Sequence, residues 1–255
     1  MSTKRSTPSS SSSTPSVGEP SPNKPKRARV SSSLHANGLT TTIPEGNLLF
    51  AVPKKGRLYE RVLSLLNGIG INFRRKARLD IANSTNMPIS LIFLNAHDVA
   101  VYVAKGTVDL GITGEDIIAE SQSQSNVEFQ LKLDIGQCKL CLQAPKNLCR
   151  LDPKEFSGKR IVTSFPFLTK QYFDKLDKET GRTTSIQYVS GSVEAACGLG
   201  LADAVVDLVE TGTTMRAAGL DIVDDLMSTE TVLVSNPNSE HKVLIEQLSN
   251  RVTGW

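Results

Sequence analysis

The stretch Leu201-Ala-Asp-Ala-Val-Val-Asp-Leu-Val-Glu-Thr-Gly-Thr-Thr-Met215 contains, in order, an apolar run, a hydroxyl-rich turn and the start of a helix. The apolar run from residue 204 to 209 predicts a buried strand, because it is short and rich in valine. The segment 213–218 follows a glycine and consists largely of helix formers, so it predicts a short helix. A buried strand that leads directly into a helix is typical of an α/β fold.

The turn at 211–214 has the chemistry of an anion site. It offers free backbone N–H groups, hydroxyl donors and the positive end of a helix dipole, and a phosphate monoester fits such a place. Upstream, Asp203 and Asp207 could accept hydrogen bonds from sugar hydroxyls or hold a hard cation such as Mg²⁺. Together these groups indicate a phosphorylated sugar. The alternative, a common strand–turn–helix connection that binds nothing, stays open at this point.

The same alternation of strands and helices extends over the chain from residue 48 onward. Strands are predicted at 48–52, 79–82, 89–94, 108–113, 139–143, 159–163, 185–189 and 229–235. Helices are predicted at 58–68 and 95–105, from 114, at 167–178, from 190 and at 240–252. The pattern restarts near residue 146, so we expect an α/β protein with two lobes around a cleft, where small molecules often bind.

Charge is distributed unevenly along the 255 residues. The formal net charge is +3, but residues 1–33 carry six basic residues and one acidic residue. The rest of the chain therefore carries −2, which argues against a nucleic-acid binder. Residues 1–46 are rich in serine and proline and are predicted to be a disordered tail. Its basic segment 22–29 resembles a nuclear-import patch, although we favour a solvated tail.

Hydropathy and cysteine content indicate a cytoplasmic protein. The mean hydropathy is −0.16, and no apolar run approaches the roughly 18–20 residues of a membrane span. We expect no secretory signal, because the N-terminal residues contain no apolar segment. The four cysteines form no regular framework, which fits a reducing compartment. Cys138 and Cys141 form a CxxC pair without a second pair at zinc spacing, so a zinc or redox site is disfavoured.

A second candidate anion site follows the first predicted strand. Pro53-Lys-Lys-Gly-Arg57 places three cations just before a predicted helix. Cations are unfavourable at a helix N-terminus unless an anion is bound there. Ligands also sit at the carboxyl ends of strands in open α/β sheets. We therefore prefer a binding loop to a merely solvent-exposed basic loop.

A third region, around the strand 108–113, allows two interpretations. Asp109, Gly111 and Gly114 lie where a backbone could approach a ligand closely, because glycine leaves room for it. Tight packing of a helix on the strand would explain the glycines equally well.

Five motifs in this order resemble one known family. They are Pro53-Lys-Lys-Gly-Arg-Leu58, Asp109-Leu-Gly-Ile-Thr-Gly114, Val162-Thr-Ser164, Ser190-Gly-Ser-Val-Glu194 and the stretch from Ala202 to Thr214. The chain resembles ATP phosphoribosyltransferase, the first enzyme of histidine biosynthesis, over about residues 47–254. It is most similar to the eukaryotic, long-form type.

The resemblance implies a two-lobed fold like that of a periplasmic binding protein. The first lobe would comprise 47–142 plus 225–255, and the second lobe 143–224. The implied reaction transfers phosphoribosyl from phosphoribosyl pyrophosphate (PRPP) to N1 of ATP, with Mg²⁺ bound along with PRPP and pyrophosphate leaving. No metal site made by protein residues alone is expected.

The resemblance also implies roles for individual residues. The PRPP set is Asp203, Asp207, Thr211, Gly212, Thr213 and Thr214, in which the turn binds the 5-phosphate and the acids hold the ribose hydroxyls. The ATP set is Lys54, Gly56, Arg57, Asp109 and Gly111, in which the last two line the opposite wall. Of these, Lys54 and Arg57 would be catalytic, because they would stabilise the leaving pyrophosphate.

Long-form members continue into a regulatory domain resembling an ACT domain, which binds histidine. We expect this sequence to correspond to the catalytic part without that domain. A homo-oligomer is expected, either a dimer or, with the regulatory domain, a hexamer. Two alternatives from other classes remain: a two-lobed small-molecule-binding module, and a regulator without catalysis.

Overall fold

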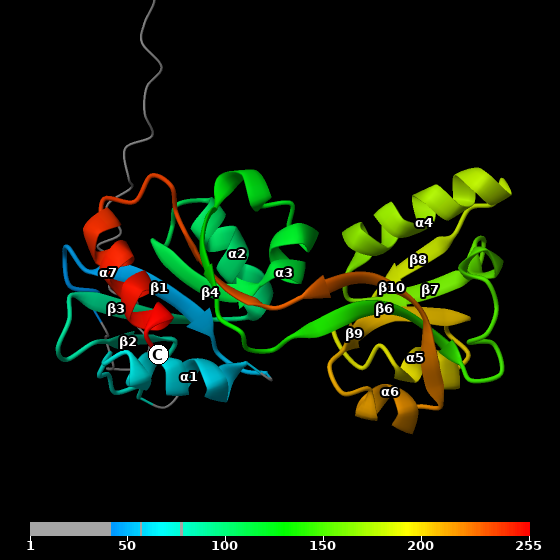
Figure 1. Cartoon of the computed structure of the whole chain (residues 1–255), viewed down its shortest axis with the longest axis horizontal. Coiled ribbons are helices and arrows are strands. Elements are labelled where there is room, and N and C mark those ends of the chain that lie inside the picture. Colours follow the sequence, from blue (N-terminus) through cyan, green and yellow to red (C-terminus); the bar gives the residue numbers. More distant parts are fainter. Residues whose placement is uncertain (1–41, 57, 77–78) are drawn as a thin grey trace, which may run out of the picture.

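In the computed structural model, residues 42–56, 58–76 and 79–255 are described. They form two lobes, each built around its own sheet (Figure 1). The predicted disordered tail and its basic segment fall almost entirely on residues 1–41, which lie outside the described residues, as does Arg57.

The first lobe contains a six-stranded mixed sheet in the order β2-β3-β1-β4-β11-β5. In that order the strands are Ile81–Asn83, Ile89–Leu94, Leu48–Pro53, Leu110–Gly114, Thr231–Ser235 and Glu128–Lys132. The helices of this lobe are α1 (Tyr59–Gly68), α2 (Ala96–Ala104), α3 (Glu115–Glu120) and α7 (Lys242–Thr253). Strand β1 runs parallel to both of its neighbours, β3 and β4.

Helices cover both faces of this sheet. Along β1, Leu48, Phe50 and Val52 pack into a core with α1 and α7, while Ala51 faces a second core with α2 and α3. This alternation of faces is the period of a strand, and burial of both faces explains the continuous apolar run in the sequence.

The second lobe contains a five-stranded sheet in the order β10-β6-β9-β7-β8. In that order the strands are Leu220–Thr229, Cys138–Pro145, Ala204–Val209, Arg160–Thr163 and Ser185–Tyr188. The helices are α4 (Pro166–Thr180) on one face and the short α5 (Ala195–Gly198) and α6 (Thr213–Ala217) on the other. Two short 3-10 turns, Gln124–Asn126 in the first lobe and Pro153–Phe156 in the second, complete the described elements.

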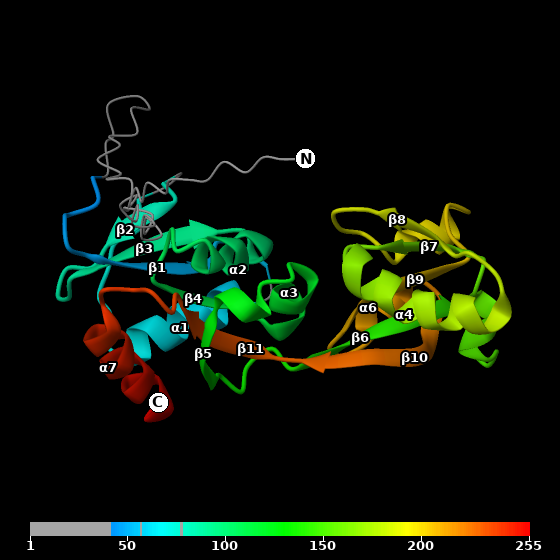
Figure 2. The same ribbon diagram turned by 90° about the horizontal axis from the view of Figure 1, so that it is seen from above.

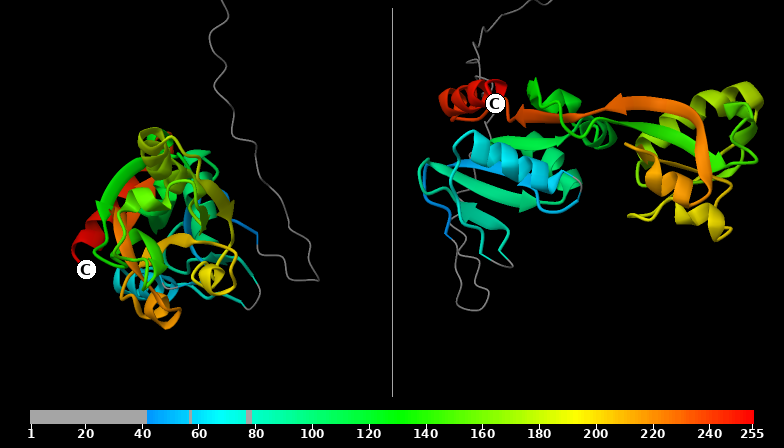
Figure 3. Two further views of the ribbon diagram at one scale, coloured as in Figure 1. Left: turned by 90° about the vertical axis from the view of Figure 1, so that its right-hand side faces the viewer. Right: turned by 60° about the horizontal axis from the view of Figure 1, so that its bottom comes forward.

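The chain crosses between the lobes twice, at residues 133–137 and at Glu230 (Figure 2). The two crossing segments lie side by side (Figure 3) and are hydrogen bonded: Leu133 N donates to Thr231 O at 3.0 Å, and Thr231 N donates to Ile135 O at 3.1 Å. The predicted lobe boundaries at 142/143 and 224/225 fall inside β6 and β10. Both of these strands pair within the second sheet, so the crossings lie nearer to the first lobe.

Most predicted elements are present with small shifts at their ends. Two strands, β5 and β10, have no counterpart among the predictions, and the helix predicted from residue 190 is reduced to the four residues of α5. Among the described residues, no helix is long and apolar enough to cross a membrane.

Candidate active site

The turn after β9 has a defined and accessible geometry. Gly212 is buried and adopts φ +71°, a left-handed conformation that favours glycine. The exposed hydroxyls of Thr211 and Thr213 lie 2.9 Å apart, and Arg216 Nη2 donates to Thr211 O at 2.6 Å. Thr214 is also exposed. The turn thus presents three threonine side chains to solvent over a glycine that no larger residue could replace without strain.

Asp207 lies within β9, half-buried, on the approach to this turn. Its Oδ1 accepts a hydrogen bond from Leu208 N at 2.8 Å, and its backbone carbonyl accepts one from Gln143 Nε2 at 3.0 Å. Gln143 is on the neighbouring strand β6, so the position of Asp207 is set by two strands. Both contacts fix Asp207 within the strand that leads into the turn.

The structure does not bring Asp203 to the same place. Asp203 directly precedes β9, at the end of the strand opposite to the turn. The rise per residue of a strand puts it about 13 Å from Asp207, four residues later. Arg160 donates three hydrogen bonds to the carboxylate of Asp203, from Nη2 at 2.9 Å, from Nε at 3.2 Å and from its own backbone N–H at 2.9 Å. These hydrogen bonds lower the pKa of Asp203. We therefore correct the predicted ribose-binding pair: Asp203 pairs with Arg160 before β9 begins, and Asp207 is the acid nearer to the turn along the chain.

The basic loop after β1 lies at the carboxyl end of its strand, as predicted. Lys54 and the exposed Gly56, with φ +91°, lead into α1. However, Lys54 Nζ lies 3.3 Å from Asp80 Oδ2, so a carboxylate of the protein itself already pairs with a cation of this loop. Charge imbalance alone therefore does not require a bound ligand here.

Sequence reasoning assigned no role to the segment 74–76, which the structure places beside Lys54. Arg75 Nη2 lies 3.2 Å from Asp80 Oδ1, so one carboxylate joins this arginine to Lys54. The guanidinium of Arg75 also stacks on Phe93, with 4.0 Å to the ring centroid. Its neighbours Arg74 and Lys76 are exposed, so this edge of the first lobe carries several cations. The cluster of basic residues was the available signal, but its place next to Lys54 depends on the fold.

Asp109 is not part of the cleft. It is fully buried at the start of β4, where Oδ2 accepts from Leu49 N at 2.9 Å and Oδ1 accepts from Ser239 Oγ at 2.7 Å. Asp109 N bonds Leu49 O, four residues before the end of β1, so this carboxylate lies at the far edge of the sheet from Lys54. The predicted role of Asp109 in ATP binding is therefore corrected to a structural one.

Gly111 likewise serves packing. A Cβ on Gly111 would come within 2.7 Å of Val103 and 2.8 Å of Val99, both on α2. Of the two interpretations of this glycine, tight packing of a helix on the strand is the one that the geometry supports.

One ion pair connects the two candidate loops across the lobes. Arg61 Nη2, in the first turn of α1, lies 3.5 Å from Oε1 of Glu210, which directly precedes Thr211. The helix after the Lys54 loop and the turn of the second lobe therefore face each other (Figure 1). Phosphate groups bound between them would meet cations from one side and N–H and hydroxyl donors from the other.

The CxxC pair has no sign of reactivity. Cys138 and Cys141 are buried on β6, and burial together with Asp225 raises the pKa of Cys141 to about 12. A thiol with such a pKa stays protonated near neutral pH, so Cys141 is not a reactive thiolate. No group of three or more His, Cys, Asp or Glu suited to a metal ion occurs in the described part of the chain.

Comparison with known proteins identifies the family. A family model described as HisG, ATP phosphoribosyltransferase, matches residues 95–254. The ATP phosphoribosyltransferase of Debaryomyces hansenii is 49% identical over 219 residues, covering 85% of this chain and 72% of that protein. The chain belongs to the ATP phosphoribosyltransferase family. The enzyme from Saccharomyces cerevisiae is 49% identical over 213 residues, and the match covers 81% of this chain and 70% of that enzyme. The chain is thus a transferase of the first step of histidine biosynthesis.

Solved structures agree with this ATP phosphoribosyltransferase fold. A chain of the ATP phosphoribosyl transferase (HisG:HisZ) complex from Thermotoga maritima superposes with a TM-score of 0.67 at 29% identity, covering 82% of this chain and all of that one. An ancestral arginine-binding protein superposes with a TM-score of 0.54 at 13% identity, over 82% of this chain and 92% of that one. The second likeness supports the two-lobed fold only.

Proposed function

We propose that the enzyme transfers the phosphoribosyl group of PRPP to N1 of ATP in the cleft between the Thr211–Thr214 turn and the Lys54 loop. The observation that carries this proposal is that these two loops leave the carboxyl ends of β9 and β1 in different lobes and are joined by the Arg61–Glu210 ion pair. Such edges are where open α/β sheets bind ligands.

The turn of the second lobe would bind the 5-phosphate of PRPP. Its helix, α6, has only five residues, so the helix dipole contributes little and the binding must come from backbone N–H groups and threonine hydroxyls. The left-handed Gly212 allows successive N–H groups to converge, and Thr211, Thr213 and Thr214 supply hydroxyl donors. Asp207, next to the turn, would accept hydrogen bonds from the ribose hydroxyls.

The loop of the first lobe would bind the other phosphates. Lys54, Gly56 and Arg57 are the proposed contacts to the pyrophosphate of PRPP and to the phosphates of ATP. Arg57 is assigned by family resemblance alone, since it lies outside the described residues. The exposed Arg74 and Lys76 add positive charge beside Lys54, which supports a site for polyphosphate on this edge.

The reaction itself needs no nucleophile from the protein. The lone pair of N1 forms a bond to the anomeric carbon of the ribose while the bond from that carbon to pyrophosphate oxygen breaks, and the electron pair leaves with pyrophosphate. The anomeric carbon becomes positively charged in the transition state. Two tasks remain for the chain: to align the two substrates in line, and to stabilise the negative charge on the departing pyrophosphate.

The residues fit a Mg²⁺ ion that arrives on PRPP. Mg²⁺ keeps several waters and uses substrate phosphates with one or two carboxylates, rather than an all-protein cage. The described chain offers Asp207, on the strand that leads into the turn, and no cluster of three or more ligand residues. When bound, the ion would neutralise charge on the pyrophosphate.

The active form would be a homo-oligomer in the cytoplasm. Support for assembly comes from the Thermotoga maritima structure, which is described as a complex of HisG with HisZ.

Turnover of ATP and PRPP with Mg²⁺, followed by absorbance of the phosphoribosyl-ATP product, tests the proposal. Asp207→Asn keeps the shape of the side chain but loses its charge, and should lower kcat/KM about 10²-fold. Asp221→Asn on β10 of the same lobe is the matched control and should leave activity unchanged. Equal activity of the wild type and Asp207→Asn would remove Asp207 from the site, and a folded wild type without turnover or PRPP binding would refute the proposed reaction.

A further inference from the structure

Glu120, the last residue of α3, reaches from the first lobe to the second. Its Oε1 accepts a hydrogen bond from Phe167 N at 2.8 Å, and its Oε2 accepts one from Leu168 N at 3.0 Å. Both donors are in the first turn of α4. Glu120 is only 9% exposed, so this double hydrogen bond is largely shielded from water.

The helix α4 depends on this contact for its N-terminal cap. Phe165, at the cap position, supplies no side-chain hydrogen bond, and Pro166 occupies the first helical position. The first N–H groups of a helix have no partner within it and carry the positive end of its dipole. The carboxylate of Glu120 satisfies two of these donors with its negative charge, so a residue of one lobe caps a fifteen-residue helix of the other.

Two other residues of α3 also contact the second lobe. Ile117 packs against the core that α4 forms with its sheet, as well as against the core of its own lobe. Thr229, the last residue of β10, donates from Oγ1 to Asp116 Oδ1 at 2.9 Å and accepts from Asp116 N at 3.0 Å. Therefore α3, although it follows β4 of the first lobe, is fixed to the second lobe by three of its six residues, Asp116, Ile117 and Glu120.

The contact lies between the two edges that hold the proposed substrate loops. α3 begins where β4 ends, next to the end of β1 from which the Lys54 loop leaves. α4 follows the end of β7, which runs parallel to β9 and its Thr211 turn. A rotation of one lobe against the other at this contact would change the distance between the two substrate loops.

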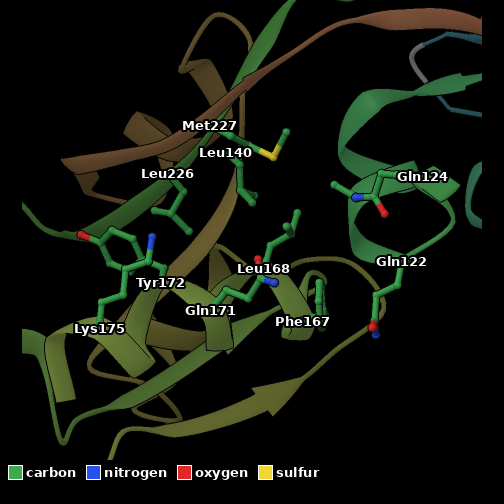
Figure 4. A pocket seen from close by; sticks show the side chains of 11 residues that line it. Gln122, Gln124, Leu140, Phe167, Leu168, Gln171, Tyr172, Lys175, Leu226 and Met227 are labelled. Atoms are coloured by element: carbon green, nitrogen blue, oxygen red, sulfur yellow. The ribbon is translucent and has the colours of Figure 1, made fainter. Parts of the chain in front are cut away.

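A cavity of about 530 Å³ next to the contact leaves room for such a rotation. Its walls come from both lobes, with Gln122 and Gln124 on one side and Phe167, Leu168, Gln171 and Tyr172 on the other (Figure 4). Beside this cavity, the two hydrogen bonds of Glu120 and the two between Asp116 and Thr229 are the directional contacts between α3 and the second lobe.

We propose that Glu120 is a positioning residue for the phosphoribosyl transfer, which holds the two lobes at the angle that aligns the substrates. This inference rests on the proposed function of the cleft. It predicts that weakening the contact lowers kcat while each lobe still binds its own part of the substrates.

The test uses the full chain with Glu120→Gln and Glu120→Asp, and Glu246→Gln on the exposed face of α7 as the matched control. Glutamine can accept from only one of the two N–H groups, and aspartate is one methylene too short to reach both. We expect kcat to fall about 10-fold to 100-fold in both variants, with KM for ATP and for PRPP changed less than kcat, because misalignment far from the reacting atoms affects the transition state most.

Small-angle scattering separates positioning from general destabilisation. The same N-terminal segment is present in every variant, so a difference in radius of gyration reports on the lobes. The proposal expects a larger radius for Glu120→Gln than for Glu246→Gln at temperatures well below unfolding. It is overturned if kcat and radius match the wild type, or if kcat falls with an unchanged radius. An inactive wild type would instead refute the proposed reaction, so the two failures are distinguishable.

Discussion

The two loops proposed to bind the substrates, the Thr211–Thr214 turn and the Lys54 loop, use different chemistry. The turn has threonine hydroxyls and backbone N–H groups on a backbone fixed by the left-handed Gly212, and the guanidinium of Arg216 is bonded to the carbonyl of Thr211. The Lys54 loop has charged lysine side chains, and Asp80 balances part of the charge of Lys54 and of the neighbouring Arg75. A fixed group of neutral donors suits a phosphate that stays in place, whereas lysine charges suit a pyrophosphate that gains charge and leaves.

This comparison predicts that the two loops affect different kinetic parameters. Loss of a contact that is equally strong in the bound substrate and in the transition state raises KM, whereas loss of a contact that strengthens in the transition state lowers kcat. The turn should belong to the first class and the Lys54 loop to the second.

The largest effect is expected for Lys54→Met. Removal of a cation from the leaving pyrophosphate should reduce kcat about 10²–10³-fold with a small change in KM. Lys105→Met, on the exposed C-terminal end of α2, is the control in the same lobe. Steady-state kinetics at saturating ATP and PRPP measures both. A variant with normal kcat would assign the leaving-group role to other cations.

The next effect concerns the turn. Thr214→Val removes one hydroxyl donor without changing the shape of the side chain, and should raise KM for PRPP about 10-fold with kcat nearly unchanged. Thr183→Val, in an exposed loop of the same lobe, should have no effect. A fall in kcat with constant KM would show that the two loops do not divide their roles as the comparison states.

A smaller effect is expected from salt. Exposed charges are screened beyond about 8 Å at physiological ionic strength, and neutral hydrogen-bond donors are affected less. The kcat should therefore fall several-fold between low and high salt, and Lys54→Met should reduce this dependence while Thr214→Val leaves it unchanged. Equal salt dependence in all three proteins would contradict the difference in chemistry.

The smallest effect is expected for Asp203→Asn, the acid that lies outside both loops. Loss of its exposed ion pair with Arg160 should lower the free energy of unfolding by less than about 1 kcal/mol and leave kcat and KM unchanged. Arg160 lowers the pKa of Asp203, so its contribution is present above roughly pH 4 and is lost as pH falls through the folded pKa. Thermal unfolding of the wild type and Asp203→Asn between pH 3 and 7 measures this difference in stability. A fall in activity of the variant would show that Asp203 does take part in substrate binding.

The sequence predicts the apolar elements well, because burial leaves a clear pattern. The strand 204–209 and the strand 89–94 coincide with β9 and β3. In contrast, β10 carries Asp221, Asp224 and Asp225 and contains two irregularities in its pairing with β6, so neither its composition nor its period indicates a strand.

The candidate site was predicted where residues are close in sequence and missed where the fold brings them together. The turn at 211–214 is local, and its geometry follows from one glycine. The predicted ligand-binding roles of Asp109 and Asp203 are wrong because each residue precedes a strand. A strand of five or six residues separates each of them from the carboxyl end, where the candidate loops lie. Asp80 and Arg75 reach Lys54 only through the pairing of β3 with β1 and β2, which spacing does not reveal.

The position of β11 has a consequence for synthesis on the ribosome. β11 lies between β4 and β5 in the first sheet, yet it is made after the whole second lobe. The second lobe is one continuous segment from β6 to β10 and can fold as soon as it emerges. The sheet of the first lobe lacks its strand between β4 and β5 until residues 231–235 are synthesised. The part of the enzyme that is translated first is therefore completed last.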